Sequence, residues 1–528
     1  MSTSDRTLTR RQRTTLLAVI ALALMMVVSA VSGLNVALPG LAVDTGASQT
    51  QVTWIVDAYT LVFVGLLLPA GALGDRYGRK GVLLAGLLIF GSAAAAAMFV
   101  SSPTTLIILR AAMGIGAAAV MPVTLSIITT TFHPEERGRA VGLWVGIAGG
   151  GAVIGLFASG ILLEFFAWNS FFALNVALAV LAFLGTLVVI PASRDAHPPL
   201  LDLLGAMTSL LGVVALVYGI IEGPERGWSD PVTIGAFTFS AVALVSFVLW
   251  ELRNPEPMLD VRLFRLRGFG TGTLALTAQF FASFGMFYIV LQYLQYIAGL
   301  SPLKSAVALL PLPAVLIPLA RRAPGIADRF GANRVVALGL TLSASGMFVM
   351  TTLGVDLVYW HLAVGLVLFA AGLGLAGTPS TTAVVSSLPP GKQGVASAVN
   401  DTSRELGSAL GIAILGTILS SSYRHGLAGS LSGLPTALAG RAESSVSFIR
   451  LGTDHLGPTG ATLIAAARQS FVDATGTAFL TAAGVLLLAA GYVVARAPKR
   501  GELQPSEEAT SPSACAKSES TGQRSAVR

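Results

Sequence analysis

Hydrophobic runs long enough to form membrane-spanning helices recur along nearly the whole chain of 528 residues. A helix needs about 20 predominantly apolar residues to cross the hydrocarbon core of a bilayer, and we count fourteen such runs. Charged residues make up only 11% of the chain, about half the share of roughly a quarter that soluble domains carry. We therefore predict an all-α, polytopic membrane protein. The runs begin near Leu16, Val52, Gly81, Thr104, Ala140, Trp168, Leu203, Val232, Phe269, Pro302, Arg334, His361, Gly394 and Phe471.

Lys and Arg residues gather in alternate connections between the runs, on the side of the N-terminus. Cytoplasmic loops of membrane proteins carry such an excess of positive charge. We therefore expect a multi-pass protein of the cytoplasmic membrane with both termini in the cytoplasm, and we interpret the net charge of +7 as a topology signal rather than as a sign of nucleic-acid binding. The basic positions are Arg76, Arg79, Lys80, Arg137, Arg139, Arg253, Arg262, Arg265, Arg267, Arg321, Arg322, Arg329 and Arg334.

Residues that carry enzyme or metal chemistry are scarce. The single cysteine, Cys515, excludes an intrachain disulfide and a cysteine metal site. The five histidines form no pair with the spacing of metal ligands, and no Gly-x-x-x-x-Gly-Lys-Ser/Thr phosphate-binding loop occurs. We expect no catalytic residue, no metal and no cofactor.

A distinctive connection follows the second run, where residues 71–80 read Gly-Ala-Leu-Gly-Asp-Arg-Tyr-Gly-Arg-Lys. A weaker echo, Ala-Asp-Arg-Phe-Gly-Ala-Asn-Arg, follows the tenth run at residues 327–334. Paired loops of this kind are expected when two halves of six helices arose by duplication. The second copy comes after the tenth run and not after the eighth, so we expect two additional spans between the halves.

This reasoning divides the chain into five parts. A cytoplasmic N-terminal segment at residues 1–13 precedes a six-helix bundle at 14–190 and two additional linker helices at 191–267. A second six-helix bundle at 268–496 is followed by a tail at 497–528 whose composition predicts disorder. Within the second bundle, residues 421–470 are expected to form a long polar loop on the outer side, either a passive connection or a cap over the outer mouth.

Several motifs together resemble one known family. The loop at residues 71–80 is similar to the cytoplasmic loop between helices two and three of the major facilitator superfamily, and the whole pattern over about residues 10–496 resembles its fourteen-helix drug:proton antiporter branch. The resemblance implies the major facilitator fold, with two pseudo-symmetric six-helix bundles plus two helices, and proton-driven export of drugs. The supporting motifs are residues 35–39 (Asn-Val-Ala-Leu-Pro), residues 54–59 (Trp-Ile-Val-Asp-Ala-Tyr), Arg110 with residues 114–116 (Gly-Ile-Gly), and residues 394–407.

Two positions depart from the pattern of that family. Ala30 stands where the family often has an aspartate in span one. Leu156 stands in residues 155–160, Gly-Leu-Phe-Ala-Ser-Gly, where the family's antiporter motif usually has proline. Both departures fall where the family is thought to handle coupling or conformational change.

Five charged residues lie inside predicted spans. A charge there costs about 2.5–3.5 kcal/mol even on a lenient insertion scale, so it persists where it is functional, paired or buried in protein. A carboxyl group in surroundings of low dielectric readily holds a proton. It can then bind a proton or a cationic substrate but hardly both, which is the simplest chemical basis for antiport. The candidates for handling protons and substrate charge are Asp57, Arg110, Asp401, Arg404 and Glu405.

Among these candidates we predict Asp57 and Glu405 as the coupling carboxylates. The family resemblance implies that Arg110 tunes a nearby acid. A structural pair between Asp401 and Arg404, three residues apart, is the alternative for part of the set.

The loop signature is interpreted as a conformational latch formed by Gly71, Asp75, Arg76, Gly78 and Arg79. Its glycines permit a sharp turn, and an acid can lie near the positive N-terminal end of a neighbouring helix. The resemblance implies that the partner of Asp75 is the start of span thirteen. The alternative is a simple topology anchor.

Span nine carries polar and aromatic residues at every fourth position. Aromatic faces attract cations by about 0.5–2 kcal/mol each, so this stripe is a candidate wall for lipophilic cations, whereas helix packing or lipid contact is the alternative. The candidates for the substrate cavity are Asn35, Phe280, Phe284, Tyr288, Gln292 and Tyr296.

The sequence therefore predicts a proton-coupled exporter of amphipathic or cationic small molecules, with the proton gradient as its source of energy. Export of a specific endogenous metabolite, antibiotic or lipid with altered or absent proton coupling is the alternative, and a membrane sensor or scaffold is a third. We expect a monomer whose partners are small molecules, protons and the lipid bilayer, with no nucleic acid.

Overall fold

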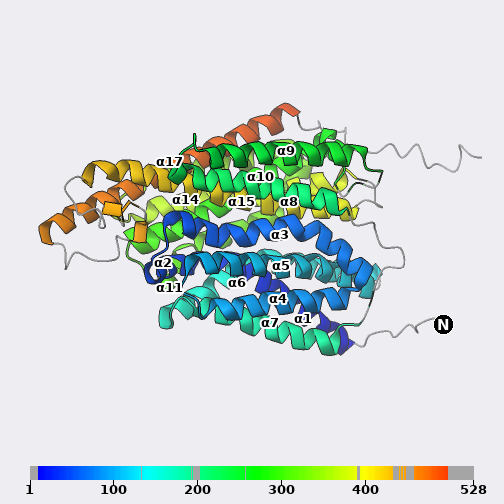
Figure 1. Ribbon diagram of the computed structural model, residues 1–528. Coiled ribbons are helices and arrows are strands. Elements are labelled where there is room, and N and C mark those ends of the chain that lie inside the picture. The colour runs from blue at the N-terminus through cyan, green and yellow to red at the C-terminus, as the bar shows by residue number, and fades with distance from the viewer. Residues whose placement is uncertain are drawn as a thin grey trace, which may run out of the picture.

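The computed structural model of the chain describes residues 10–132, 134–191, 193, 202–255, 257, 259–388, 393–431, 439–440, 442–443, 445–447 and 457–496. Every regular element within these residues is a helix, as the hydrophobic runs predict. The long helices lie side by side in one elongated bundle (Figure 1). They are α1 (Arg10–Ser32), α2 (Leu34–Thr45), α3 (Gln49–Tyr77), α4 (Arg79–Ala97), α5 (Pro103–Thr131), α6 (Pro134–Phe165), α7 (Ser170–Val189), α8 (Leu203–Arg226), α9 (Pro231–Arg253), α10 (Arg267–Gln292), α11 (Pro302–Ala308), α12 (Pro311–Phe330), α13 (Ala332–Met350), α14 (Tyr359–Ser386), α15 (Gln393–Leu427) and α17 (Gly457–Arg496).

Thirteen helices among the described residues are long and apolar enough to cross a membrane. They stand at the positions of thirteen of the predicted runs, with α11 and α12 together forming the span Pro302–Phe330. The remaining run, predicted to begin near Ala140, falls in the 32-residue helix α6, of which Val153–Phe165 is a described apolar part. The helices therefore follow the predicted order along the chain.

The helices pack in two groups, with α8 where the groups meet. Helices α1 to α7 contact one another, as do α10 and α12 to α17, and we refer to these groups as the N-terminal half and the C-terminal half. Helix α11 belongs to the C-terminal half by its place in the chain but packs mainly against α6 of the N-terminal half. Helices α8 and α9 pack together, and α8 also contacts α3 of one half and α15 of the other. The start of α1 marks one end of the bundle, the N-terminal end, whereas α2 and α11 lie at the opposite end, the far end (Figure 1).

Capping groups set where α3 begins at the far end. The Ser48 hydroxyl accepts a hydrogen bond from the backbone N–H of Gln51 at 3.2 Å, and the Gln51 side chain accepts one from the backbone N–H of Ser48 at 3.0 Å. This reciprocal capping box satisfies two donors that the helix itself leaves unpaired. The first turns of α3, which carry Gln49 and Thr53, are thereby fixed in position.

The paired loops of the sequence share one backbone geometry. Gly78 joins α3 to α4 with a φ of 108°, and Gly331 joins α12 to α13 with a φ of 92°. In each loop the glycine N–H donates to the carbonyl four residues earlier, at 3.1 Å for Gly78 and 2.8 Å for Gly331. Positive φ values of this kind favour glycine, which lacks a Cβ. The weak sequence echo thus corresponds to two equivalent sharp turns.

The long polar loop predicted at residues 421–470 is shorter than expected. Helix α15 continues to Leu427 and is followed by the 3₁₀ turn η4 (Ala428–Ser430), while α17 already begins at Gly457. The alanine-rich stretch at residues 461–467 has high helix propensity, which explains why the polar composition did not prevent a helix. Residues 432–438 and 448–456 of the predicted loop lie outside the described part of the chain, as does the predicted tail at 497–528.

Candidate functional site

A first group of buried residues is carried by α3 and α5. Ile55 and Tyr59 are on the face of α3 that meets α5, whereas Asp57, one turn after Thr53, is on the face that meets α10. Asp57 is wholly buried, and neither of its carboxylate oxygens has a hydrogen-bond partner. Arg110 is equally buried; its Nε donates to the Ile55 carbonyl at 2.9 Å, and its guanidinium lies 4.4 Å from the centre of the Tyr59 ring. Tyr59 in turn donates to the Val27 carbonyl of α1 at 3.0 Å. Arg110 is thus held by a backbone carbonyl and an aromatic face, and no ion pair joins it to the described side chain of Asp57.

A second group lies on α15, facing α10 and α14. Glu405 is half-buried, and its Oε2 is shielded from solvent without a hydrogen-bond partner. Arg404 donates through Nη2 to the Thr381 hydroxyl at 3.1 Å, and its guanidinium lies 5.3 Å from the centre of the Phe280 ring. Asp401 accepts a hydrogen bond at 3.2 Å from the amide of its neighbour in the chain. The structure therefore holds no ion pair between the described side chains of Asp401 and Arg404, the alternative that the sequence left open.

The two candidate coupling acids lie at different depths of the bundle. A Cβ added at Gly416 of α15 would lie 3.2 Å from the Thr53 hydroxyl of α3, so Gly416 and Thr53 are at the same level along the bundle axis. The two helices run in opposite directions, because residues later in α3 cluster with residues earlier in α15. At 1.5 Å per residue, Asp57 lies about 6 Å and Glu405 about 16 Å from this level toward the N-terminal end. About 10 Å along the bundle axis thus separates the two acids.

Uncharged hydrogen bonds join the two halves at the far end. The Gln49 amide of α3 donates to the Tyr288 hydroxyl at 2.9 Å and to the Gln292 side-chain carbonyl at 3.0 Å. The hydroxyls of Thr53 and Tyr288 share a further hydrogen bond of 2.9 Å. All four side chains are buried. These residues, hereafter the far-end seal, close the bundle between α3 and α10 at that end.

The stripe predicted on span nine is divided by this seal. Phe280 and Phe284 are half-buried, with ring centres 6.1 Å apart, and Phe280 lies under Arg404. Tyr288 and Gln292 belong to the far-end seal, and Tyr296, in a π-helical turn η2 (Tyr293–Ile297), donates to a backbone carbonyl of α2 at 3.4 Å. The stripe is therefore not one continuous wall in this conformation, since contacts across the bundle occupy three of its five residues.

Asn35 and the two departures from the family pattern lie in or beside the packing of α1 and α2 against α6. Asn35 is buried and donates to a backbone carbonyl one turn earlier at 3.1 Å, while its Oδ1 has no hydrogen-bond partner. Ala30 and Leu156 are buried as well. Next to them, a Cβ added at Gly155 would lie 2.8 Å from the Cα of Ser29. The departures thus lie in a tightly packed contact between α1 and α6 that is lined by serine and small side chains.

The predicted latch residues lie at the N-terminal end, where α3 meets α4. Asp75 accepts hydrogen bonds from Arg79 Nε at 2.9 Å and from the Ser126 hydroxyl of α5 at 3.1 Å, and it forms an ion pair of 2.8 Å with Arg79 Nη2. Arg76 is exposed. A Cβ added at Gly71 would lie 3.4 Å from the Cβ of Pro122 in α5, and Gly78 supplies the positive φ. Asp75 thus contacts residues of its own half. Its expected partner is the first turn of α15, which includes residues whose side chains the structure does not describe.

Some residues of these clusters were not singled out by the sequence. Tyr59 stands within a family motif, but nothing in the motif shows that its ring lies against Arg110. Gln49 and Thr53 are ordinary polar residues in the first turns of a helix, and their partners on α10 follow more than 230 residues later in the chain. Their polarity inside a predicted span was the one signal that could have drawn attention to them.

The two halves of the bundle consist of membrane-spanning helices and are joined by hydrogen bonds at one end. Buried charged residues without ion-pair partners lie inside the bundle. This is the architecture of a membrane transporter. A family model of the Major Facilitator Superfamily matches residues 20–412, and the chain belongs to this superfamily. It is therefore a multi-pass membrane transporter and not an enzyme, as the sequence predicted.

Similar proteins include two resistance and efflux proteins. The chain is 34% identical over 407 residues to the puromycin resistance protein of Streptomyces alboniger, covering 76% of this chain and 81% of that protein. It is 32% identical over 486 residues to the multidrug efflux pump LfrA of Mycolicibacterium smegmatis, covering 92% and 96%. A bacterial homolog to the human lysosomal transporter Spinster superposes with a TM-score of 0.62 at 17% identity, covering 93% of this chain and 100% of that one. This last likeness shows the fold.

Proposed function

We propose that this transporter exports amphipathic or cationic small molecules across the cytoplasmic membrane in exchange for protons. The names of the two relatives, which refer to puromycin resistance and multidrug efflux, support the substrate class. The concentration of Lys and Arg on the N-terminal side supports a cytoplasmic N-terminal end. With that orientation the far-end seal closes the outer side.

The observation that carries the proposal is the isolation of the Asp57 carboxyl group. It is wholly buried and neither oxygen has a partner, while Arg110 lies against the opposite face of α3. An unpaired buried carboxylate is costly as an anion, so this group gains by binding a proton. Opening of the far end would let the proton exchange with the outside, which couples protonation to conformation.

Glu405 is the second acid of the proposed mechanism. It lies next to Arg404 and about 10 Å nearer the N-terminal end than Asp57. Phe280, under the Arg404 guanidinium, already accepts a cation on its ring face. A lipophilic cation arriving from the N-terminal end would compete with Arg404 for Phe280 and with a proton for Glu405. Substrate and proton then exclude each other at this acid.

The test uses inverted membrane vesicles that contain the protein and carry a proton gradient, acidic inside. Ethidium uptake that depends on the gradient and is abolished by a protonophore is expected, because inversion turns export into uptake. Asp57→Asn and Glu405→Gln should each reduce this uptake, whereas Asp473→Asn, at an exposed acid of α17, should not. Unchanged proton-driven uptake in the Asp57→Asn/Glu405→Gln double variant would refute the role of both acids.

A second candidate is export of a specific endogenous metabolite, antibiotic or lipid with altered or absent proton coupling. The observation that favours it is the burial of Ala30 and Leu156 at positions where the family pattern that the sequence resembles has an acid and a proline. Correctly folded protein that transports no ethidium, and substrate flux that a protonophore leaves unchanged, would favour this candidate.

A further inference from the structure

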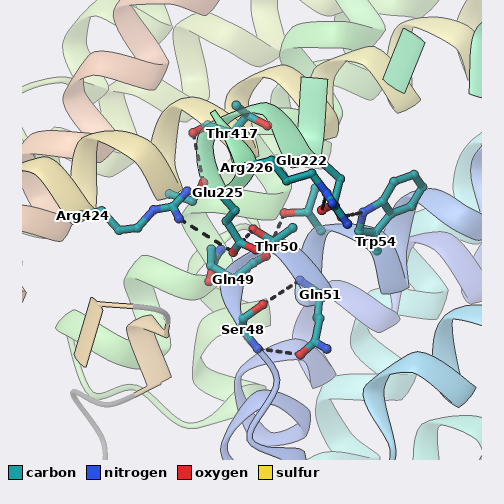
Figure 2. A network of polar contacts seen from close by, with 12 residues as sticks. Ser48, Gln49, Thr50, Gln51, Trp54, Glu222, Glu225, Arg226, Thr417 and Arg424 are labelled. Atoms are coloured by element: carbon teal, nitrogen blue, oxygen red, sulfur yellow. Dashed lines mark hydrogen bonds and ion pairs between the residues drawn. The ribbon is translucent and has the colours of Figure 1, made fainter. Parts of the chain in front are cut away.

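The last two turns of α8 carry two carboxylates that meet both halves of the bundle at the far end (Figure 2). Glu222 accepts a hydrogen bond from the indole N–H of Trp54 in α3 at 2.9 Å through Oε1. Its other oxygen accepts from Arg226 Nε, one turn later in α8, at 3.2 Å. Both oxygens of Glu222 are therefore engaged, and one of them holds α8 against the N-terminal half.

Glu225 lies between the two halves. Its Oε1 accepts a hydrogen bond of 2.5 Å from the Thr50 hydroxyl of α3, and the same oxygen lies 3.9 Å from Arg424 Nη1 of α15 (Figure 2). A second contact joins α8 to α15, because the Thr417 hydroxyl donates to the Ile220 carbonyl at 3.1 Å. A single carboxylate oxygen thus connects a helix of the N-terminal half to a helix of the C-terminal half.

The two sides of this connection differ in strength. The contacts of α8 with α3 are short hydrogen bonds to carboxylates, which are stronger than those between neutral groups. The ion pair with Arg424 is long, and its side chains are 19% and 35% exposed, so solvent weakens it. When α3 and α15 separate at the far end, α8 should remain with α3 and its contacts with α15 should break.

We propose that α8 is a clasp in which Glu222 and Glu225 act as positioning residues that hold α3 and α15 together at the far end. The clasp sets the balance between the conformation closed at that end and the one open there. It thereby gives the linker helix a part in the transport cycle, although α8 carries none of the candidate coupling residues. The inference goes beyond the proposed function and does not depend on which substrate is carried or whether protons drive it.

The test measures the distance between the halves at the far end. Asp44 of α2 and Lys304 of α11 are exposed there, one on each half. Spin labels on Asp44→Cys and Lys304→Cys, in a chain whose sole cysteine is replaced by Cys515→Ala, report the closed and open populations by pulsed electron paramagnetic resonance in lipid nanodiscs. In Glu222→Ala/Glu225→Ala the ratio of open to closed molecules should rise about 1.5-fold to fivefold.

A matched control is Asp356→Asn, which changes an exposed acid between α13 and α14 and should leave the ratio unaltered. Should the double variant fail to fold, Thr50→Val and Trp54→Phe break the same hydrogen bonds from the α3 side and should each raise the ratio by a smaller factor. An unchanged distance distribution in whichever of these variants folds would overturn the clasp, whatever happens to transport.

Discussion

Gly411 of α15 lies directly against the main chain of α10, beside the candidate site. A Cβ added there would clash with the carbonyl oxygen of Phe281 and would lie 2.8 Å from its carbonyl carbon and 2.9 Å from its Cα. Carbon atoms in contact are ordinarily about 3.5–4.0 Å apart, so Gly411→Ala requires α10 and α15 to separate by about 0.7 Å or more. The obstacle is backbone, which cannot rotate aside as a side chain can.

The expected cost of this substitution follows from two opposing effects. Forcing an extra carbon into a packed interior costs about 1–3 kcal/mol, while alanine in a helix gains about 0.5–1 kcal/mol over glycine. A net loss of about 1–2 kcal/mol corresponds to a fall of about 2–8 °C in the unfolding temperature for a cooperative unit of 150–250 residues. Because Phe280 adjoins Phe281, the separation should also move its ring away from Arg404 and raise the KM for transport.

The assay follows tryptophan fluorescence of the purified protein during heating in detergent. The matched control is Gly377→Ala in α14, where nothing lies within 4 Å of an added Cβ, so this variant should be at least as stable as the wild type. An unfolding temperature of Gly411→Ala equal to that of Gly377→Ala would refute the reasoning, because it would show that the two helices separate at no cost.

Three further substitutions test the contacts around the site. Arg110→Lys keeps the charge but loses the planar group that lies on Tyr59, so thermal unfolding should show a loss of about 0.5–2 kcal/mol; stability equal to the wild type would contradict the contact. Tyr288→Phe removes two hydrogen bonds of the far-end seal, worth about 0.6 kcal/mol each inside membrane proteins, and should raise the open population of the Asp44/Lys304 spin-label pair about threefold to tenfold; an unaltered population would show that the seal does not hold that end. Asp75→Ala should lower the turnover rate more than substrate binding, because Asp75 fixes the turn between α3 and α4; vesicle flux measured over a range of substrate concentrations separates the two, and normal turnover would leave the loop as a topology anchor.

The order of the helices could be predicted from the sequence because each span needs a run of apolar residues that is visible by itself. The repeated turn at Gly78 and Gly331 could also be anticipated, since its glycines and charges recur in one short motif. The pairing of Arg110 with Tyr59, and of Gln49 with Tyr288, could not. These contacts depend on how helices far apart in the chain pack together, and no local pattern encodes that packing.

The ends of the helices, unlike their order, could not all be predicted from the sequence. Residues 421–470 were predicted as a loop because they are polar and rich in glycine, a composition that marks the end of the apolar span and not the end of the helix. Helix α15 runs on to Leu427, and α17 starts at Gly457. Apolar content indicates where lipid begins, whereas helix propensity and tertiary contacts, such as that of Tyr423 with the Ala442 carbonyl at 3.0 Å, decide where a helix stops.

The far-end seal consists of two glutamines, a threonine and a tyrosine, none of which ordinarily changes its charge between pH 5 and pH 8. A barrier made of such groups keeps its strength when the acidity on either side of the membrane changes. A transporter that works between two compartments of different pH needs that property, since a gate that loosened on protonation would leak most when the gradient is steepest. Under the proposed exchange for protons, sensitivity to protons would reside in the buried acids, and the barrier would not respond to the gradient.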